Sequence, residues 1–191
     1  LMIADNIQDS HDLAAAAAEG VSVIVYDFEN TDIQALAERI QEELNERPSA
    51  SIAFAAHGWG PGEFELTKGK MVSADALAND GEIRSFWEKM GAAAGEKGRI
   101  DLLACGLAGG MDGALFMESM EEVAGAHVAA SEDATGNEAA GGDFEMETDG
   151  ASAADIYLKT EHLSVFDSLL GNGDFKDSGQ SLGTGVSRGA A

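Results

Sequence analysis

Four short, almost wholly apolar segments limit most strongly how this chain can fold. They read VSVIVYDF (21–28), ASIAFAAH (50–57), RIDLLAC (99–105) and HVAASED (127–133). A continuous apolar run is typical of a strand buried on both faces, whereas a strand with one face in water alternates. Strands that alternate with helices build a mostly parallel sheet covered on both sides. The sequence therefore predicts an α/β fold, a three-layer α/β/α sandwich.

The segments between these strands carry helix and turn signals. In TDIQ, Thr31 and Gln34 predict a capping box that opens a helix closed by Pro48. Glycines and a proline follow His57, and they indicate that regular structure is lost there. The other expected elements are a first strand over 1–5, helices over 9–20, 82–95 and 112–124, a hairpin over 63–73 turning at Lys68–Gly69, an edge strand over 141–150 and a last apolar segment over 155–170.

The length of 191 residues suits one domain followed by a tail. The chain is 45% apolar, which is enough for a proper core, and it holds no apolar run long enough to span a membrane. Composition changes at Gly171, after which glycine and serine dominate. We expect residues 1–170 to form the domain and residues 171–191 a linker or tail.

The chain is strongly acidic, with 35 acidic and 11 basic residues and a net charge of −24. Nucleic-acid phosphates would be repelled by such a surface, so the charge argues against a nucleic-acid partner. It fits a protein kept in solution by self-repulsion, and equally a set of acidic faces that are simply solvated.

Two of the predicted strands end on reactive side chains, His57 and Cys105. The carboxyl ends of parallel strands share one edge of a sheet, and neighbouring strands lie roughly 5 Å apart. A cysteine nucleophile needs an imidazole at such a distance. The alternative is that Cys105 is a small buried residue and His57 a hydrogen-bonded cap at a strand end.

The flanking residues suit a catalytic edge. Glycines after His57 let a substrate backbone approach, and the Gly58 amide is a candidate oxyanion donor. The helix that starts near Asp112 is expected to lower the pKa of the Cys105 thiol. The histidines and the cysteine do not occur at the spacings typical of a zinc site, which needs several ligands. Neither a metal nor a cofactor is therefore expected.

Three sequence blocks carry a resemblance to a known family. AAHGWGPGEFEL, the segment from IDLLACGLAGG to EDATGN, and AAGGDFEME occur in the order found in DUF4347 domains. These domains lie near the N-termini of very large bacterial secreted or surface proteins, and the similarity covers roughly residues 1–170. Ala56 departs from the family pattern, which usually has serine there. The resemblance implies a secreted or cell-surface location.

That family in turn resembles cysteine peptidases of the caspase–hemoglobinase type. Carried over to this chain, the resemblance implies that His57 is the general base or acid and Cys105 the nucleophile. The amides of Gly58 and Cys105 would then hold the oxyanion. The implied function is that of a cysteine endopeptidase. Its substrate would be a polypeptide, and its own parent chain is one candidate. The alternative is a non-catalytic cap or interaction module of an extracellular assembly.

The loop after the last predicted strand suggests a substrate preference. Glu132 and Asp133 would border the same cleft and favour Arg or Lys before the scissile bond. Lys176 and Arg188 are then candidate self-cleavage points. The alternative is that the two carboxylates form an exposed acidic turn.

Overall fold

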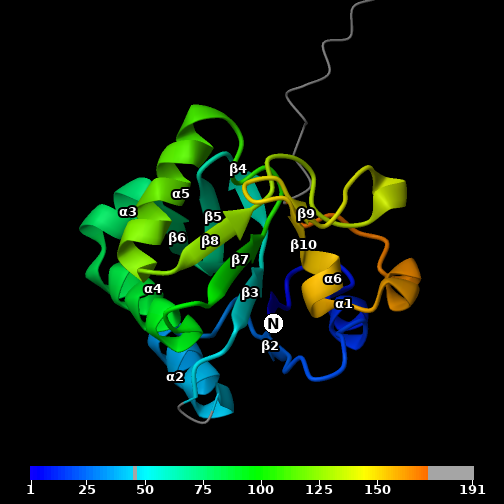
Figure 1. Ribbon diagram of the computed structural model, residues 1–191, viewed down its shortest axis with the longest axis horizontal. Helices are drawn as coiled ribbons and strands as arrows, with labels where there is room; N and C mark the ends of the chain where they lie inside the picture. The colour runs from blue at the N-terminus through cyan, green and yellow to red at the C-terminus, as the bar shows by residue number, and fades with distance from the viewer. Residues whose placement is uncertain (45–46, 172–191) are drawn as a thin grey trace, which may run out of the picture.

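A five-stranded parallel sheet forms the centre of the computed structural model, which describes residues 1–44 and 47–171 (Figure 1). Its strand order is β2-β1-β3-β7-β8, and every neighbouring pair is parallel. The strands are β1 (Met2–Ala4), β2 (Ile24–Tyr26), β3 (Ser51–Ala55), β7 (Arg99–Leu103) and β8 (His127–Ala130).

Helices cover both sides of this sheet (Figure 1). One layer holds α2 (Ile33–Leu44), α3 (Ala74–Asn79), α4 (Gly81–Ala94) and α5 (Gly110–Ala124), and the other holds α1 (Ser10–Ala15) and α6 (Ala153–Tyr157). Two short 3-10 helices, η1 (Glu138–Ala140) and η2 (Thr160–Val165), lie on the same side as α6. The predicted three-layer α/β/α sandwich is confirmed.

Two small antiparallel sheets accompany the central one. The first comprises β4 (Gly58–Gly60), β5 (Glu63–Thr67) and β6 (Lys70–Ser73), and the second pairs β9 (Glu145–Met146) with β10 (Ala151–Ser152). The hairpin predicted at Lys68–Gly69 is confirmed, with Gly69 at a φ of +76°.

The core joins the central sheet to the hairpin through aromatic side chains. Trp87 of α4 is fully buried and lies edge-on to Phe54 of β3 at 5.0 Å and to Phe64 of β5 at 6.1 Å between ring centroids. Such edge-to-face pairs add to the free energy gained by burying the rings. The packing fixes the hairpin, and with it the segment that follows His57, against the sheet.

Some local predictions were wrong. Asp32, not Thr31, caps α2, because its Oδ1 accepts the backbone N–H groups of Gln34 at 2.8 Å and Ala35 at 3.2 Å. Two predicted elements are much shorter, since α1 ends at Ala15 and β9 holds only two residues. The segment after His57 keeps regular structure as β4, because its backbone pairs with β5.

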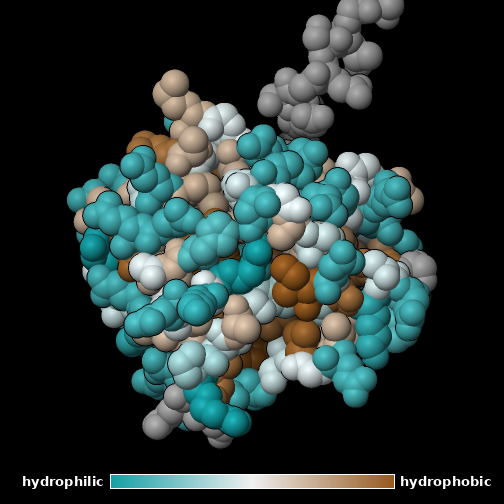
Figure 2. Space-filling view, viewed as in Figure 1, coloured by the Kyte–Doolittle hydropathy of each residue, from teal (hydrophilic) through white to brown (hydrophobic). Residues whose placement is uncertain are grey.

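Hydrophilic residues cover most of the face seen in Figure 2, and hydrophobic ones gather near its middle. Among the described residues, no helix is both long and apolar enough to cross a membrane.

Candidate functional site

His57 and Cys105 lie just beyond the carboxyl ends of two adjacent strands. Strands β3 and β7 pair in register up to Ala55 and Leu103, and the Ala56 amide donates to the Leu103 carbonyl at 3.2 Å. Each reactive residue follows its strand by two positions. The structure thus brings together the two strand ends that the sequence singled out.

The chain that follows His57 touches the backbone at Cys105. A Cβ atom placed on Gly58 would lie 2.4 Å from the Cys105 carbonyl oxygen and 3.0 Å from its nitrogen. No side chain fits in that space, so only glycine allows β4 to run this close to the cysteine.

Where β4 touches Cys105, two backbone amides donate to the same oxygen atom. The N–H of Gly58 donates to the Leu170 carbonyl at 3.1 Å, and the N–H of Cys105 donates to the same oxygen at 3.3 Å. These are the two amides that the sequence named as oxyanion donors. A pair of backbone donors converging on a single carbonyl oxygen is the arrangement that stabilises charge developing on that oxygen.

The His57 ring is half-buried and its two nitrogens have different surroundings. Nε2 lies 3.1 Å from the Asn6 carbonyl oxygen. A carbonyl only accepts, so in the neutral ring Nε2 carries the proton and Nδ1 keeps the lone pair. Nδ1 is buried and has no hydrogen-bond partner among the described residues. The neutral imidazole therefore presents a free basic nitrogen inside the protein.

The Cys105 side chain is fully buried and contacts the backbone of Thr135. Sγ accepts the Thr135 N–H at 3.3 Å and lies 3.4 Å from the Thr135 carbonyl oxygen, to which the thiol donates. Burial raises the pKa of the thiol from 9.0 to about 11, against the opposite effect of the N–H groups of Thr135 and Leu170 beside it. The expected lowering of this pKa by α5 was wrong, because loss of water around the sulfur outweighs nearby dipoles.

The segment that supplies the Leu170 carbonyl is itself paired like a short strand. Leu170 donates its N–H to Thr135 at 2.9 Å, Leu169 forms an antiparallel bridge with Gly136, and the Asn137 N–H donates to Ser168 at 3.0 Å. This segment was not predicted to belong to the site. The one signal near it is the change of composition at Gly171.

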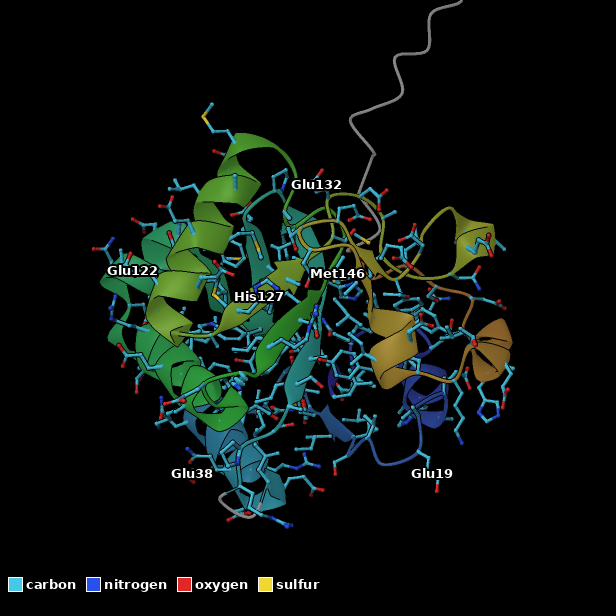
Figure 3. All side chains as sticks on the ribbon, in the orientation of Figure 1. Glu19, Glu38, Glu122, His127, Glu132 and Met146 are labelled. Atoms are coloured by element: carbon cyan, nitrogen blue, oxygen red, sulfur yellow. The ribbon has the colours of Figure 1, made fainter. Side chains whose placement is uncertain are left out.

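The two predicted substrate-binding carboxylates lie in the loop after β8, and both are exposed. Figure 3 shows Glu132 beyond the end of β8 opposite to His127. The Glu132 N–H donates to a Glu147 carboxylate oxygen at 2.8 Å, and the Asp133 carbonyl accepts the Gly106 N–H at 2.5 Å. This loop thus adjoins the residue after Cys105 through its backbone.

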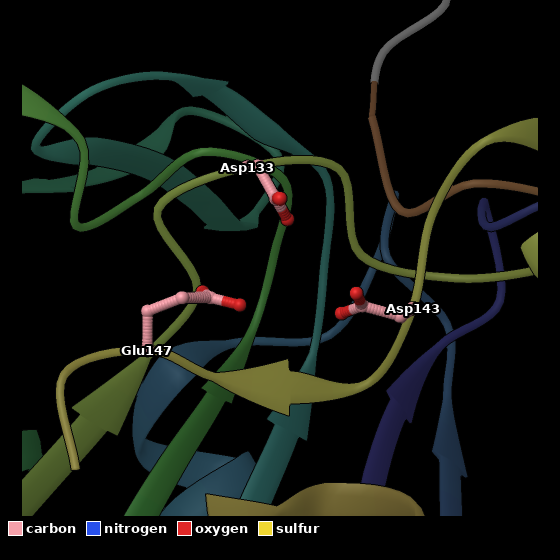
Figure 4. Close-up of side chains that lie close together, drawn as sticks. All are labelled: Asp133, Asp143 and Glu147. Atoms are coloured by element: carbon pink, nitrogen blue, oxygen red, sulfur yellow. The ribbon is translucent and has the colours of Figure 1, made fainter. Parts of the chain in front are cut away.

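Asp133, Asp143 and Glu147 face one another above the central sheet (Figure 4). One oxygen from each lies within 4.8 Å of the others, and all three residues are exposed. Clusters of exposed carboxylates are common on a protein this acidic, so we assign no ion to it. The candidate cleavage points Lys176 and Arg188, and the tail from residue 172, lie outside the described residues.

A comparison with protein families gives one match, to a domain of unknown function, DUF4347, over residues 1–170. No curated protein and no solved structure matched the chain.

Proposed function

Because this chain belongs to the DUF4347 family, whose function is unknown, we propose from its site that it is a cysteine endopeptidase resembling the caspase–hemoglobinase type. The observation that carries the proposal is the pair of N–H groups, from Gly58 and Cys105, that hold one peptide carbonyl oxygen beside the only cysteine. We further propose a polypeptide substrate, including the parent chain, and a secreted or cell-surface location.

The proposed reaction assigns one role to each group. Sγ of Cys105 attacks the carbonyl carbon held at the two amides, and Nδ1 of His57 takes the thiol proton. The C–N bond then breaks as His57 passes this proton to the departing amine. Water attacks the resulting thioester, which leaves a carboxylic acid on the substrate and returns a proton to sulfur.

The buried thiol makes His57 necessary for this reaction. With a pKa near 11, Cys105 is protonated at neutral pH, so attack must be coupled to proton removal. His57 has the required tautomer, since Nε2–H faces the Asn6 carbonyl and Nδ1 is unpartnered within the described part of the chain. A general base must reach the proton that it removes. Within the described residues the thiol donates to the Thr135 carbonyl and Nδ1 has no partner, so the proposed transfer requires the thiol to leave that carbonyl.

The proposal is tested on the full chain of residues 1–191. We expect the wild-type chain to lose mass on incubation, while Cys105→Ala and His57→Ala stay at full length. His127→Ala is the matched control, because that histidine lies exposed at the opposite end of β8 and its variant should behave like the wild type.

A second readout is alkylation of Cys105 by iodoacetamide, which should be slower in His57→Ala. The peptidase would be contradicted if all four chains stayed at full length and Cys105 was alkylated equally fast in the wild type and in His57→Ala.

The second candidate function is a non-catalytic cap or interaction module of an extracellular assembly. The complete burial of Cys105, together with its raised pKa, favours this candidate, because an inert structural cysteine has both properties. It predicts that Cys105→Ala changes neither the mass of the chain nor its association with other proteins. The net charge of −24 argues against nucleic acid as the partner in either case.

A further inference from the structure

We propose that the Leu170–Gly171 peptide bond is the bond that this site cleaves in its own chain. This inference rests on the proposed peptidase function and adds the identity of the substrate. It also implies that the residue before the scissile bond is apolar.

The first support is the position of the Leu170 carbonyl. Its oxygen accepts the N–H groups of both Gly58 and Cys105. In a hydrolase with an oxyanion hole, the carbonyl held there belongs to the residue before the scissile bond. Gly171, on the other side of that bond, forms a parallel bridge with Gly58, so both sides of the bond lie against the site.

The second support is the way in which the preceding residues are bound. Ser168, Leu169 and Leu170 pair antiparallel with Thr135–Asn137 through backbone hydrogen bonds of 2.9 and 3.0 Å. Peptides bound by strand addition gain their affinity from such main-chain bonds. A Cβ on Gly136 would lie 2.5 Å from the Ser168 carbonyl oxygen, so the close approach requires this glycine, whose φ is +138°.

The third support is that one loop holds both the nucleophile and the substrate segment. The Thr135 backbone contacts Sγ of Cys105 through its N–H and its carbonyl, and the same carbonyl accepts the Leu170 N–H. The sulfur and the Leu170 N–H therefore lie next to each other, because both contact the Thr135 carbonyl oxygen. Such placement replaces a bimolecular encounter by an intramolecular one.

The side chain of Leu170 indicates that the subsite for the residue before the scissile bond is apolar. It is fully buried and belongs to the hydrophobic core cluster, as does Phe166 four residues earlier. A lysine or arginine in its place would bury an unpaired charge, which is strongly unfavourable. The carboxylates of Glu132 and Asp133 are exposed, so they lie in water rather than around a buried basic side chain.

Cleavage of this bond takes place in two steps. Sγ of Cys105 bonds to the Leu170 carbonyl carbon, the bond from that carbon to the Gly171 nitrogen breaks, and the thiol proton reaches the new amine through His57. Water then hydrolyses the thioester. The products are a chain ending in the Leu170 carboxylate and a peptide beginning with the Gly171 amine.

The experiment locates the cut in the full chain by intact mass and by sequencing of the released peptide. We expect two fragments, residues 1–170 and 171–191, from the wild type and none from Cys105→Ala. The variant Leu170→Met, which keeps apolar volume, should still be cut. We expect Leu170→Lys to be cut at least about tenfold more slowly, since burying an ammonium costs more than the 1.4 kcal/mol that a factor of ten represents.

The matched control is Val165→Lys, which adds the same charge at an exposed position of the same segment. It should be cut at the wild-type rate. Thermal unfolding of all variants shows whether Leu170→Lys is folded. If it is not, the cut in Leu170→Met and its absence in Cys105→Ala still decide the result.

Two outcomes would overturn the inference. A Cys105-dependent cut elsewhere, such as after Lys176 or Arg188, would refute Leu170 as the cleavage position while supporting the peptidase. A wild-type chain that stays whole would refute self-cleavage at Leu170. In that case the proposed function is judged separately, by whether His57→Ala slows the alkylation of Cys105.

Discussion

Cys105 shows how one buried residue combines a structural with a proposed chemical role. Its side chain has no exposure, and its sulfur is held between the N–H and the carbonyl of Thr135. Burial favours the neutral thiol, so the site keeps a weak nucleophile until a base removes its proton. In the proposed reaction, His57 supplies that base at the adjacent strand end.

The raised pKa of Cys105 predicts a loss of stability at alkaline pH. The pKa is about 11 in the folded chain and 9.0 for an ordinary thiol. The stabilisation is therefore fully present below pH 9 and disappears as the pH rises through 11. At pH 11 the free energy of unfolding should have fallen by about 2 kcal/mol more in a chain with Cys105 than in Cys105→Ala.

Urea denaturation at intervals of about one pH unit between pH 8 and pH 11 measures this difference in the free energy of unfolding. Both chains carry His57→Ala, so that cleavage does not complicate the comparison. Parallel pH profiles for the two chains would show that the thiol ionises as easily in the folded as in the unfolded state.

At the scale of elements, a buried polar contact ties α6 to the central sheet. Asp101 of β7 has no exposure, and it accepts hydrogen bonds from the Arg99 guanidinium and from the Tyr157 hydroxyl of α6. Arg99 also pairs with Asp149 at 3.0 Å. A buried carboxylate is tolerated in the sheet because these partners replace its water.

We expect Tyr157→Phe to lower the free energy of unfolding by about 1.5–3 kcal/mol, because a buried carboxylate loses a hydrogen bond. The matched control is Tyr26→Phe, whose buried hydroxyl donates to the neutral Leu66 carbonyl at 2.7 Å. That variant should lose only about 1 kcal/mol. Urea denaturation compares the two, and an equal or smaller loss for Tyr157→Phe would refute the special role of the contact with Asp101.

At the scale of the whole molecule, the dominant electrostatic feature is the net charge of −24. Figure 3 labels Glu19, Glu38 and Glu122 at well-separated points of the periphery. Repulsion among such charges opposes the compact state, and dissolved salt screens it.

The free energy of unfolding should therefore rise as sodium chloride increases from about 0.01 to 0.3 M, over which the Debye length falls from about 30 Å to below 8 Å. Urea denaturation at each concentration measures the change. Choline chloride is the control, because simple screening predicts the same increase with either cation. Constant or falling stability would mean that the surface ion pairs outweigh the repulsion.

The sequence predicted the architecture because apolar periodicity is a local signal. Buried strands over 50–57 and 99–105 and the hairpin at Lys68–Gly69 were visible in their own residues. Boundaries were less predictable, since the cap of α2 depended on which of two adjacent residues, Thr31 or Asp32, faced the helix. Strand β4 was missed because its pairing comes from β5 rather than from its own composition.

The sequence by itself determined that His57 and Cys105 each end a buried apolar segment and precede glycines. Tertiary structure decided that these strands are neighbours, that Gly58 contacts the Cys105 backbone, and that Leu170 returns to both. The physical reason is that this return depends on hydrogen bonds between backbone groups. Every residue except proline carries the same backbone donor and acceptor, so the sequence does not show which of these groups pair. Only the folded chain shows which carbonyl lies between the two amides.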